Sequence, residues 1–229
     1  MTNGKCRDIA RSIDHSLLHP AMTEGELTEG TRAAAEWGVA SVCVKPYFVA
    51  RARVLLTGSA VNAGTTVGFP HGGHASAAKL AEARQALEDG AQEIDMVVNI
   101  GKVLSADWSY VEDEIGAIVG LGHEGGAVVK VIFENCYLEE EHKRRLSRIS
   151  REVGADFIKT STGYGSGGAT EGDLRLMLEE AGPQMGVKAA GGIRSYDQLL
   201  HLRELGVRRF GLSQTERILA ECRRETGGS

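Results

Sequence analysis

The sequence predicts an α/β protein, a single (β/α)₈ TIM barrel over residues 1–229 with a short N-terminal helix. Eight short β-rich runs alternate with longer stretches of helical pattern, which is typical of parallel β-α units. Dividing 229 residues among eight units gives about 29 each, enough for one strand, one helix and two loops. A doubly wound sheet would more often carry a GxGxxG turn after its first strand, and residues 13–20 (IDHSLLHP) have none. We expect the strands at residues 11–15, 39–44, 65–68, 93–98, 128–133, 157–160, 186–189 and 208–211.

Helical patterns fill the segments between these runs, most clearly at residues 75–88, 138–152 and 196–205. Three pairs have the spacing of a capping box and predict helix starts: Thr23 with Glu26, Ser195 with Gln198, and Ser213 with Glu216. Glycines at positions 38, 90, 154 and 206 are expected to end the preceding helices. No linker-like segment divides the chain.

Composition excludes several classes of protein. With 42% hydrophobic and 25% charged residues, the chain has the composition of an ordinary globular domain. The formal net charge of 26 − 31 = −5 excludes a strongly basic nucleic-acid binder. No apolar stretch approaches the roughly 18 residues that span a bilayer, and residues 1–16 lack the apolar segment of a signal peptide. We therefore expect a cytoplasmic protein without membrane partners.

The four cysteines, Cys6, Cys43, Cys136 and Cys222, are widely scattered and form no CxxC pair. This pattern argues against disulfides and against a zinc site, so reduced thiols are expected. His71 and His74 have no cluster of further ligands nearby in the sequence and are interpreted as loop residues. The sequence predicts no metal.

Three lysines occupy the apolar runs. Lys130, Lys159 and Lys188 are separated by 159 − 130 = 29 and 188 − 159 = 29 residues, so three consecutive units present an amine at matched positions. Strand alternation places each on one face, and if that face points inward the ammonium groups converge. The alternative is that each lysine extends out of its strand, or pairs with an acid such as Glu134 or Asp156.

A buried lysine beside another cation can act as a nucleophile. Burial and a like-charged neighbour both lower the pKa of an amine. To form imines near neutral pH, that pKa must fall from about 10.4 to near 7.4, a change of about 4 kcal/mol. Asp95, at the fourth strand, could move protons among the lysines or form a structural ion pair. Asp14 is interpreted as either a site carboxylate or a turn-capping residue, and Cys43 as a pocket-lining residue.

Glycines follow the last two strands, in Gly191-Gly192-Ile193-Arg194-Ser195 and in Gly211-Leu212-Ser213-Gln214. Each segment leads into an expected helix start, where backbone N–H groups bind phosphate. The loops after strands 7 and 8 are where barrels commonly do so, and residues 163–168 (GYGSGG) could contribute a third segment.

These residues carry a resemblance to the deoxyribose-phosphate aldolases, a family of class I aldolases. The segments IDHSLLHP, SVCVKP, TVGFPHG, EIDMVVNIG, VKVIFE, FIKTSTGYGSGGAT and VKAAGGIR are similar to those of the family and occur in the same order. The resemblance implies that Lys159 forms the Schiff base, that Lys188 lowers its pKa, and that Asp95 is the general acid/base. It places Lys130, Thr160 and Cys43 along the site, and the phosphate at Gly163, Gly191, Gly192, Arg194 and Ser213.

The implied reaction is the reversible cleavage of 2-deoxy-D-ribose 5-phosphate to acetaldehyde and D-glyceraldehyde 3-phosphate, with no cofactor. The run Gly211 to Thr215 departs from the family's Gly-Thr-Ser pattern through Leu212, Gln214 and Thr215. A related lysine aldolase with another acceptor is therefore the alternative, and a non-enzymatic phosphosugar-binding barrel is a third reading. The expected partners are the phosphosugar and acetaldehyde, not nucleic acid, and a homodimer is kept open.

Overall fold

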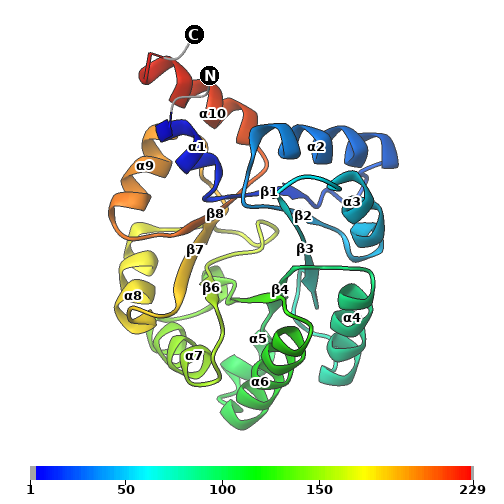
Figure 1. The fold of residues 1–229 in the computed structure, drawn as a ribbon. Coiled ribbons are helices and arrows are strands. Elements are labelled where there is room, and N and C mark those ends of the chain that lie inside the picture. Colours follow the sequence, from blue (N-terminus) through cyan, green and yellow to red (C-terminus); the bar gives the residue numbers. More distant parts are fainter. Residues whose placement is uncertain (1–3, 228–229) are drawn as a thin grey trace.

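Eight parallel strands form a closed barrel in the computed structural model, which describes residues 4–227. Each strand pairs with the next in the sequence, and β8 pairs with β1 to close the ring (Figure 1). The predicted (β/α)₈ fold is thus confirmed. The strands are β1 (Ile13–Leu17), β2 (Ser41–Val44), β3 (Asn62–Val67), β4 (Glu93–Val97), β5 (Val128–Ile132), β6 (Phe157–Lys159), β7 (Gly186–Ala190) and β8 (Arg209–Leu212).

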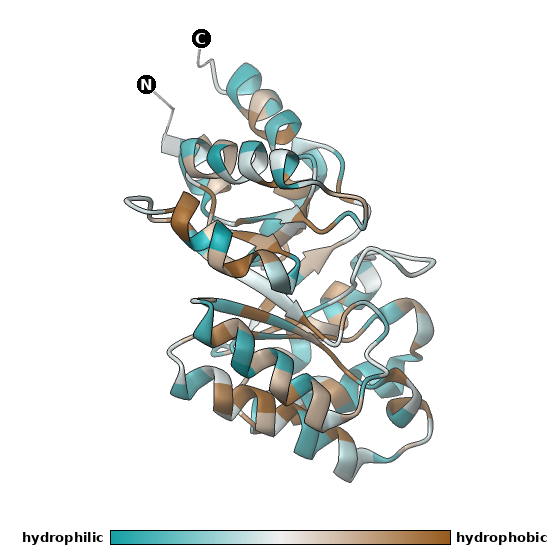
Figure 2. Ribbon diagram, turned by 90° about the vertical axis from the view of Figure 1, so that its right-hand side faces the viewer, coloured by the Kyte–Doolittle hydropathy of each residue, from teal (hydrophilic) through white to brown (hydrophobic). Residues whose placement is uncertain are grey.

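Helices surround the barrel, and a short helix precedes the first strand as predicted (Figure 1). They are α1 (Gly4–Ala10), α2 (Glu24–Trp37), α3 (Val49–Leu55), α4 (Ser76–Glu88), α5 (Ile100–Leu104), α6 (Trp108–Glu124), α7 (Glu140–Glu152), α8 (Glu171–Ala181), α9 (Tyr196–Glu204) and α10 (Thr215–Glu225), with 3₁₀ turns η1 (Pro46–Phe48) and η2 (Asn135–Tyr137). In Figure 2 hydrophobic and hydrophilic residues alternate along many of these helices, which is typical of helices with one buried face.

Two of the three predicted helix starts are confirmed. Thr23 and Glu26 form a complete capping box, and the Ser195 side chain accepts a hydrogen bond from the Gln198 N–H. The prediction at Ser213 is wrong, because α10 begins two residues later, at Thr215, and Gln214 makes no side-chain cap. The glycines at 38, 90, 154 and 206 all have positive φ within two residues of a helix end, as their predicted role requires.

Strand alternation divides the residues between the barrel interior and the helical layer. Pairs in register point the same way, so the outward pairs Ile94 with Val129 and Ile158 with Val187 pack under the helices and are almost completely buried. The inward positions carry the polar residues instead. The apolar core therefore lies between the sheet and the surrounding helices, and charged side chains occupy the interior of the barrel.

The expectation of four reduced cysteines is wrong. Cys6 of α1 and Cys222 of α10 form a disulfide, with Cα atoms 5.9 Å apart. Their separation of 216 residues conceals the proximity, which arises because closure of β8 against β1 brings the first and last helices together (Figure 1). Cys43 and Cys136 remain free thiols.

Within residues 4–227, none of the helices has both the length and the apolar character needed to cross a bilayer.

Candidate active site

The three predicted lysines lie inside the barrel on neighbouring strands, but not at one level. Lys159 of β6 is in register with Lys188 of β7, whereas its register partner on β5 is Ile132. Lys130 lies two residues before Ile132 on β5 and is therefore deeper in the barrel than Lys159, toward the amino-terminal ends of the strands. The equal spacing in the sequence correctly predicted that the lysines lie together, but they differ in depth along the barrel axis.

Asp95 of β4 receives hydrogen bonds from all three amines. Its Oδ2 accepts from Lys159 Nζ at 2.8 Å and from Lys188 Nζ at 2.7 Å, and its Oδ1 accepts from Lys130 Nζ at 2.8 Å. These four side chains are almost entirely buried. The alternative partners do not contact the lysines: Glu134 accepts a hydrogen bond from the Thr162 N–H, and Asp156 accepts one from the Val129 N–H.

A deeper layer completes the charge cluster. Asp14 contacts Lys188 Nζ at 2.5 Å and accepts a hydrogen bond from the Ser41 hydroxyl at 2.7 Å, so it is an interior carboxylate rather than a turn cap. Arg209 of β8 binds Asp14 and also Glu93, the latter at 2.6 Å. Glu93 in turn accepts a hydrogen bond from Lys130 at 2.5 Å.

Sequence reasoning missed Glu93 and Arg209. Alternation offered a signal for Glu93, which lies two residues before Asp95 and therefore on the same face of β4. Arg209 opens β8 in register with Lys188. We call the seven side chains the charge cluster: Asp14, Glu93, Asp95, Lys130, Lys159, Lys188 and Arg209.

The charge cluster holds four basic groups against three carboxylates, an excess of one positive charge if every group is ionised. Burial lowers the pKa of Lys159, and the neighbouring Lys188 lowers it further, against the opposing pull of Asp95. Burial acts on Lys188 too, but Asp14 and Asp95 outweigh it and raise the pKa of that amine. The cluster therefore loses its excess charge most readily at Lys159.

The other groups of the charge cluster remain ionised. Burial would raise the pKa of Asp95, but the three adjacent lysines hold it well below its usual range. The pKa of Lys130 is raised, because Asp95, Glu93 and Asp14 together outweigh its burial. Lys159 is thus the amine of the charge cluster that most readily becomes neutral, and its neighbours supply fixed charge.

A cavity of about 460 Å³ opens above Lys159 at the carboxyl ends of the strands. Lys159 is the member of the charge cluster that lines this mouth cavity, together with the five residues predicted to hold phosphate: Gly163, Gly191, Gly192, Arg194 and Ser213. Leu212 and Gln214 line it as well. The amine and the glycine loops therefore share one cavity.

Glycine is required where two of the mouth loops meet. A Cβ atom on Gly168 would lie 2.4 Å from the carbonyl oxygen of Gly191, closer than any real contact allows. At this junction the Ala169 N–H donates to the Gly191 carbonyl at 3.1 Å. Gly191 and Gly192 both have φ near +84°, which favours glycine. The loop after β6 is thereby joined to the loop after β7.

Six predicted site residues do not line the mouth cavity: Asp14, Asp95, Lys130 and Lys188 of the charge cluster, together with Thr160 and Cys43. Lys130 is below it in the charge cluster. Thr160 connects β6 to β7, since its hydroxyl donates to the Ala190 carbonyl and accepts from the Ala190 N–H, both at 3.1 Å. Cys43 is buried, and burial raises the pKa of its thiol to about 11, so the thiol stays protonated at neutral pH.

Tyr164 closes one side of the mouth cavity and was not singled out in the sequence. Its hydroxyl donates a hydrogen bond to the carbonyl of Leu18, in the loop after β1, at 2.8 Å. Its ring packs edge-on against Phe69, with the ring centroids 5.4 Å apart. The side chain also lines a second cavity of about 320 Å³. Tyr164 and Thr162 thus belong to the lining of both cavities.

His71 lines that second cavity and no cluster of ligands surrounds it. Between Gly4 and Gly227, no group of three or more His, Cys, Asp or Glu side chains is arranged to hold a metal ion.

A closed parallel barrel with a buried amine under a glycine-rich mouth defines an aldolase of the lysine-dependent class. The sequence model of the DeoC/LacD family aldolases matches residues 9–204, and the chain belongs to this family.

The sequence is similar to known aldolases over nearly the whole chain. A deoxyribose-phosphate aldolase from Rhodopirellula baltica is 51% identical over 227 residues, covering 99% of this chain and 94% of the relative. One from Thermococcus gammatolerans is 47% identical, covering 94% and 97%.

Solved structures give the same result. The aldolase QR15 superposes with a TM-score of 0.91 at 36% identity, covering 96% of this chain and 97% of that one. A deoxyribose phosphate aldolase from Aeropyrum pernix, described as a unique tetramer, gives 0.89 at 33% identity, covering 97% and 94%.

Proposed function

We propose that the chain is a lyase that reversibly cleaves 2-deoxy-D-ribose 5-phosphate to acetaldehyde and D-glyceraldehyde 3-phosphate, through a Schiff base on Lys159. The observation that carries the proposal is the position of this amine. It is the basic group of the charge cluster that faces the mouth cavity, and it is the one whose pKa is lowered. The family and the curated relatives support the same reaction.

Chemistry begins with attack of neutral Lys159 on the C1 aldehyde of the open-chain sugar. The carbinolamine loses water to form an iminium ion, which requires one proton on the departing oxygen. Asp95 Oδ2 contacts Lys159 Nζ, so this carboxylate can take the proton that the attacking nitrogen loses and return it, through water, to the departing oxygen. Lys188, whose pKa is raised, keeps its proton and holds positive charge beside the reacting nitrogen.

The iminium ion then accepts the electron pair of the C2–C3 bond. The C3 hydroxyl passes its proton through a water molecule to the Asp95 carboxylate as C3 becomes the aldehyde carbon of glyceraldehyde 3-phosphate, and this proton is the one later delivered to C2. The remaining two-carbon enamine on Lys159 takes a proton at C2, and water hydrolyses the resulting imine to release acetaldehyde. Because Lys188 and Lys130 stay charged around Asp95, these proton transfers occur within a buried and fixed field.

The glycine loops orient the substrate from its other end. Backbone N–H groups near the starts of α9 and α10 suit a phosphate, and Arg194 and Ser213 line the same cavity. With the phosphate held there, the aldehyde is directed toward Lys159. The family resemblance and this shared cavity support the assignment of these residues to phosphate binding.

The test is to trap the imine. The protein is incubated with acetaldehyde and sodium borohydride, and the reduced N-ethyl lysine is mapped by peptide mass spectrometry. We expect one dominant adduct at Lys159 and none in Lys159→Met. The matched control is Lys45, whose amine bonds to the carbonyls of His19 and Pro20 at the surface. Labelling of Lys45 at the same rate as Lys159, or no labelling of Lys159, would contradict the proposal.

A related aldolase with another acceptor is the second candidate, because Leu212 and Gln214 line the mouth cavity. A panel of phosphorylated and unphosphorylated aldehydes decides between them. The highest kcat/KM with 2-deoxyribose 5-phosphate removes this alternative. The homodimer and the cytoplasmic location stay predictions, and sedimentation velocity measures the first.

A further inference from the structure

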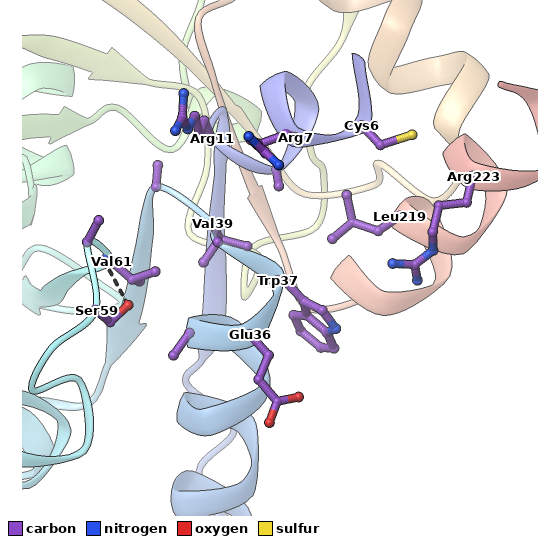
Figure 3. A pocket seen from close by; sticks show the side chains of 15 residues that line it. Cys6, Arg7, Arg11, Glu36, Trp37, Val39, Ser59, Val61, Leu219 and Arg223 are labelled. Carbon is purple, nitrogen blue, oxygen red and sulfur yellow. Dashed lines mark hydrogen bonds between the residues drawn. The ribbon is translucent and has the colours of Figure 1, made fainter. Parts of the chain in front are cut away.

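A cavity of about 790 Å³ lies at the end of the barrel opposite the mouth cavity. Residues that directly precede β1, β2 and β3 form its floor, and Leu219 and Arg223 of α10 form one side (Figure 3). The mouth cavity lies beyond the carboxyl ends of the strands, so the two cavities share no lining residue. No step of the proposed reaction involves the residues of this 790 Å³ cavity.

Three arginines line the cavity, and Glu36 is its one acidic lining residue. Arg7 and Arg11 extend from α1 and the residue after it, and Arg223 extends from α10, as Figure 3 shows. Within residues 4–227 none of the three guanidinium groups has a carboxylate partner. By contrast, Arg144 and Arg175 each contact at least one carboxylate.

The concentration of positive charge is unusual for this chain, whose net charge is −5. Arg7 and Arg11 are four residues apart, a spacing at which like charges repel. A bound anion would relieve that repulsion. Guanidinium groups bind phosphate through paired hydrogen bonds, and groups from two separate helices can hold more than one phosphate.

An apolar wall faces the arginines. Trp37, at the end of α2, is half-buried and lies beside Val39 and Leu219 along the cavity (Figure 3). Its ring packs edge-on against His15, with centroids 5.3 Å apart, and His15 is itself held by Thr215 at 2.9 Å. The indole is therefore fixed in place, and a rigid aromatic surface of this kind is suited to a planar ring.

We propose that this arginine cavity, formed by Arg7, Arg11, Trp37, Leu219 and Arg223, binds a nucleoside diphosphate. The diphosphate contacts the guanidinium groups, and the base lies against Trp37 and Leu219. The volume suits a ligand of this size and exceeds what a single inorganic phosphate fills. A free anion would use only the arginines, so the aromatic wall distinguishes the nucleotide.

Calorimetric titration of the full chain with ADP, pyrophosphate and adenosine tests the proposal. We expect saturable binding of one ADP per chain, weaker binding of pyrophosphate, and still weaker binding of adenosine. Arg223→Ala and Arg7→Ala each weaken ADP roughly tenfold to a hundredfold, since each removes a charged hydrogen bond. Trp37→Ala weakens ADP by a larger factor than pyrophosphate.

The matched control is Arg51→Ala, an exposed arginine of α3 outside the cavity, which should leave ADP affinity unchanged. Arg194→Ala distinguishes this site from the mouth cavity, and we expect no effect of it on ADP. Imine trapping at Lys159 verifies that each variant is folded.

Any of three results overturns the proposal: no saturable ADP binding up to about 1 mM, loss of binding in Arg194→Ala, or equal losses in Arg51→Ala and Arg223→Ala. A change of oligomeric state in Arg223→Ala with ADP affinity unchanged would instead assign the cavity to a second copy of the chain.

Discussion

At the scale of the residue, the reactivity of Lys159 depends on two physical effects that differ in size. Burial is the larger cause of its lowered pKa, and the charge of Lys188 is the smaller. Asp95 opposes both by stabilising the ammonium form. Desolvation is therefore what makes the amine of Lys159 lose its proton more readily, and the charge of Lys188 partly offsets the opposing effect of Asp95, to which we assign the proposed proton transfers.

Replacing Lys188 by leucine separates these effects. Loss of the cation raises the pKa of Lys159, so a smaller fraction of the amine is neutral at pH 7 and turnover falls at least about tenfold. Activity should recover partly as the pH rises, because the remaining burial still lowers the pKa. The acidic limb of kcat/KM against pH for 2-deoxyribose 5-phosphate measures the shift. Lys188→Arg keeps the charge and should keep the limb near its original position, whereas an unmoved limb in Lys188→Leu contradicts the assigned role.

At the scale of the element, strand periodicity predicted the inward face but not the depth of each residue along the barrel. The alternation in β5, β6 and β7 correctly brought three lysines together inside. The stagger between strands that places Lys130 below Lys159 arises only when the sheet closes. Arg209 was missed for a related reason, because its partners lie 195 and 116 residues away and no local pattern connects them.

Arg209 joins β8 to β1 and β4 through Asp14 and Glu93, two buried carboxylates. Arg209→Leu leaves their charges partly uncompensated, so we expect the free energy of unfolding to fall by about 3–5 kcal/mol. Urea denaturation at neutral pH measures this loss. An exposed arginine with a similar carboxylate contact provides the comparison: Arg217→Leu, which breaks the contact with Glu221, should cost less than about 1 kcal/mol. Equal losses in the two variants would mean that the interior pairing contributes no more than a surface ion pair.

The same carboxylates determine the response of stability to acid. The pKa values of Asp14, Glu93 and Asp95 are all lowered in the folded protein, from ordinary values of 3.8 and 4.5. Groups with lowered folded pKa values stabilise the fold above their unfolded pKa values, and this stability is lost as the pH falls through the folded values. The free energy of unfolding is therefore expected to change little on account of these carboxylates above about pH 5 and to decline steadily below pH 4.

At the scale of the whole molecule, closure of the barrel makes neighbours of the two ends of the chain. Strand counting and the period of about 29 residues predicted this closure, yet the cysteine pattern alone did not indicate its consequence. The spacing of cysteines in a sequence identifies disulfides only in small proteins whose fold depends on them. In this chain the barrel determines the fold, and the packing of α1 against α10 brings Cys6 and Cys222 within bonding distance.

The disulfide encloses almost the entire chain, because its cysteines are 216 positions apart in the sequence. Restricting so long a loop reduces the entropy of the unfolded state, so we expect Cys6→Ser or Cys222→Ser to lower the free energy of unfolding by about 2–5 kcal/mol. Reduction of the disulfide in the unmodified chain should lower the melting temperature by about as much as either substitution does.

Cys136→Ser is the matched control, because this thiol is exposed and free. Cleavage of 2-deoxyribose 5-phosphate near 25 °C should be unaffected, since the bridge lies between α1 and α10 and away from the mouth cavity. Four titratable thiols in the denatured, unreduced protein would show that the bridge does not form.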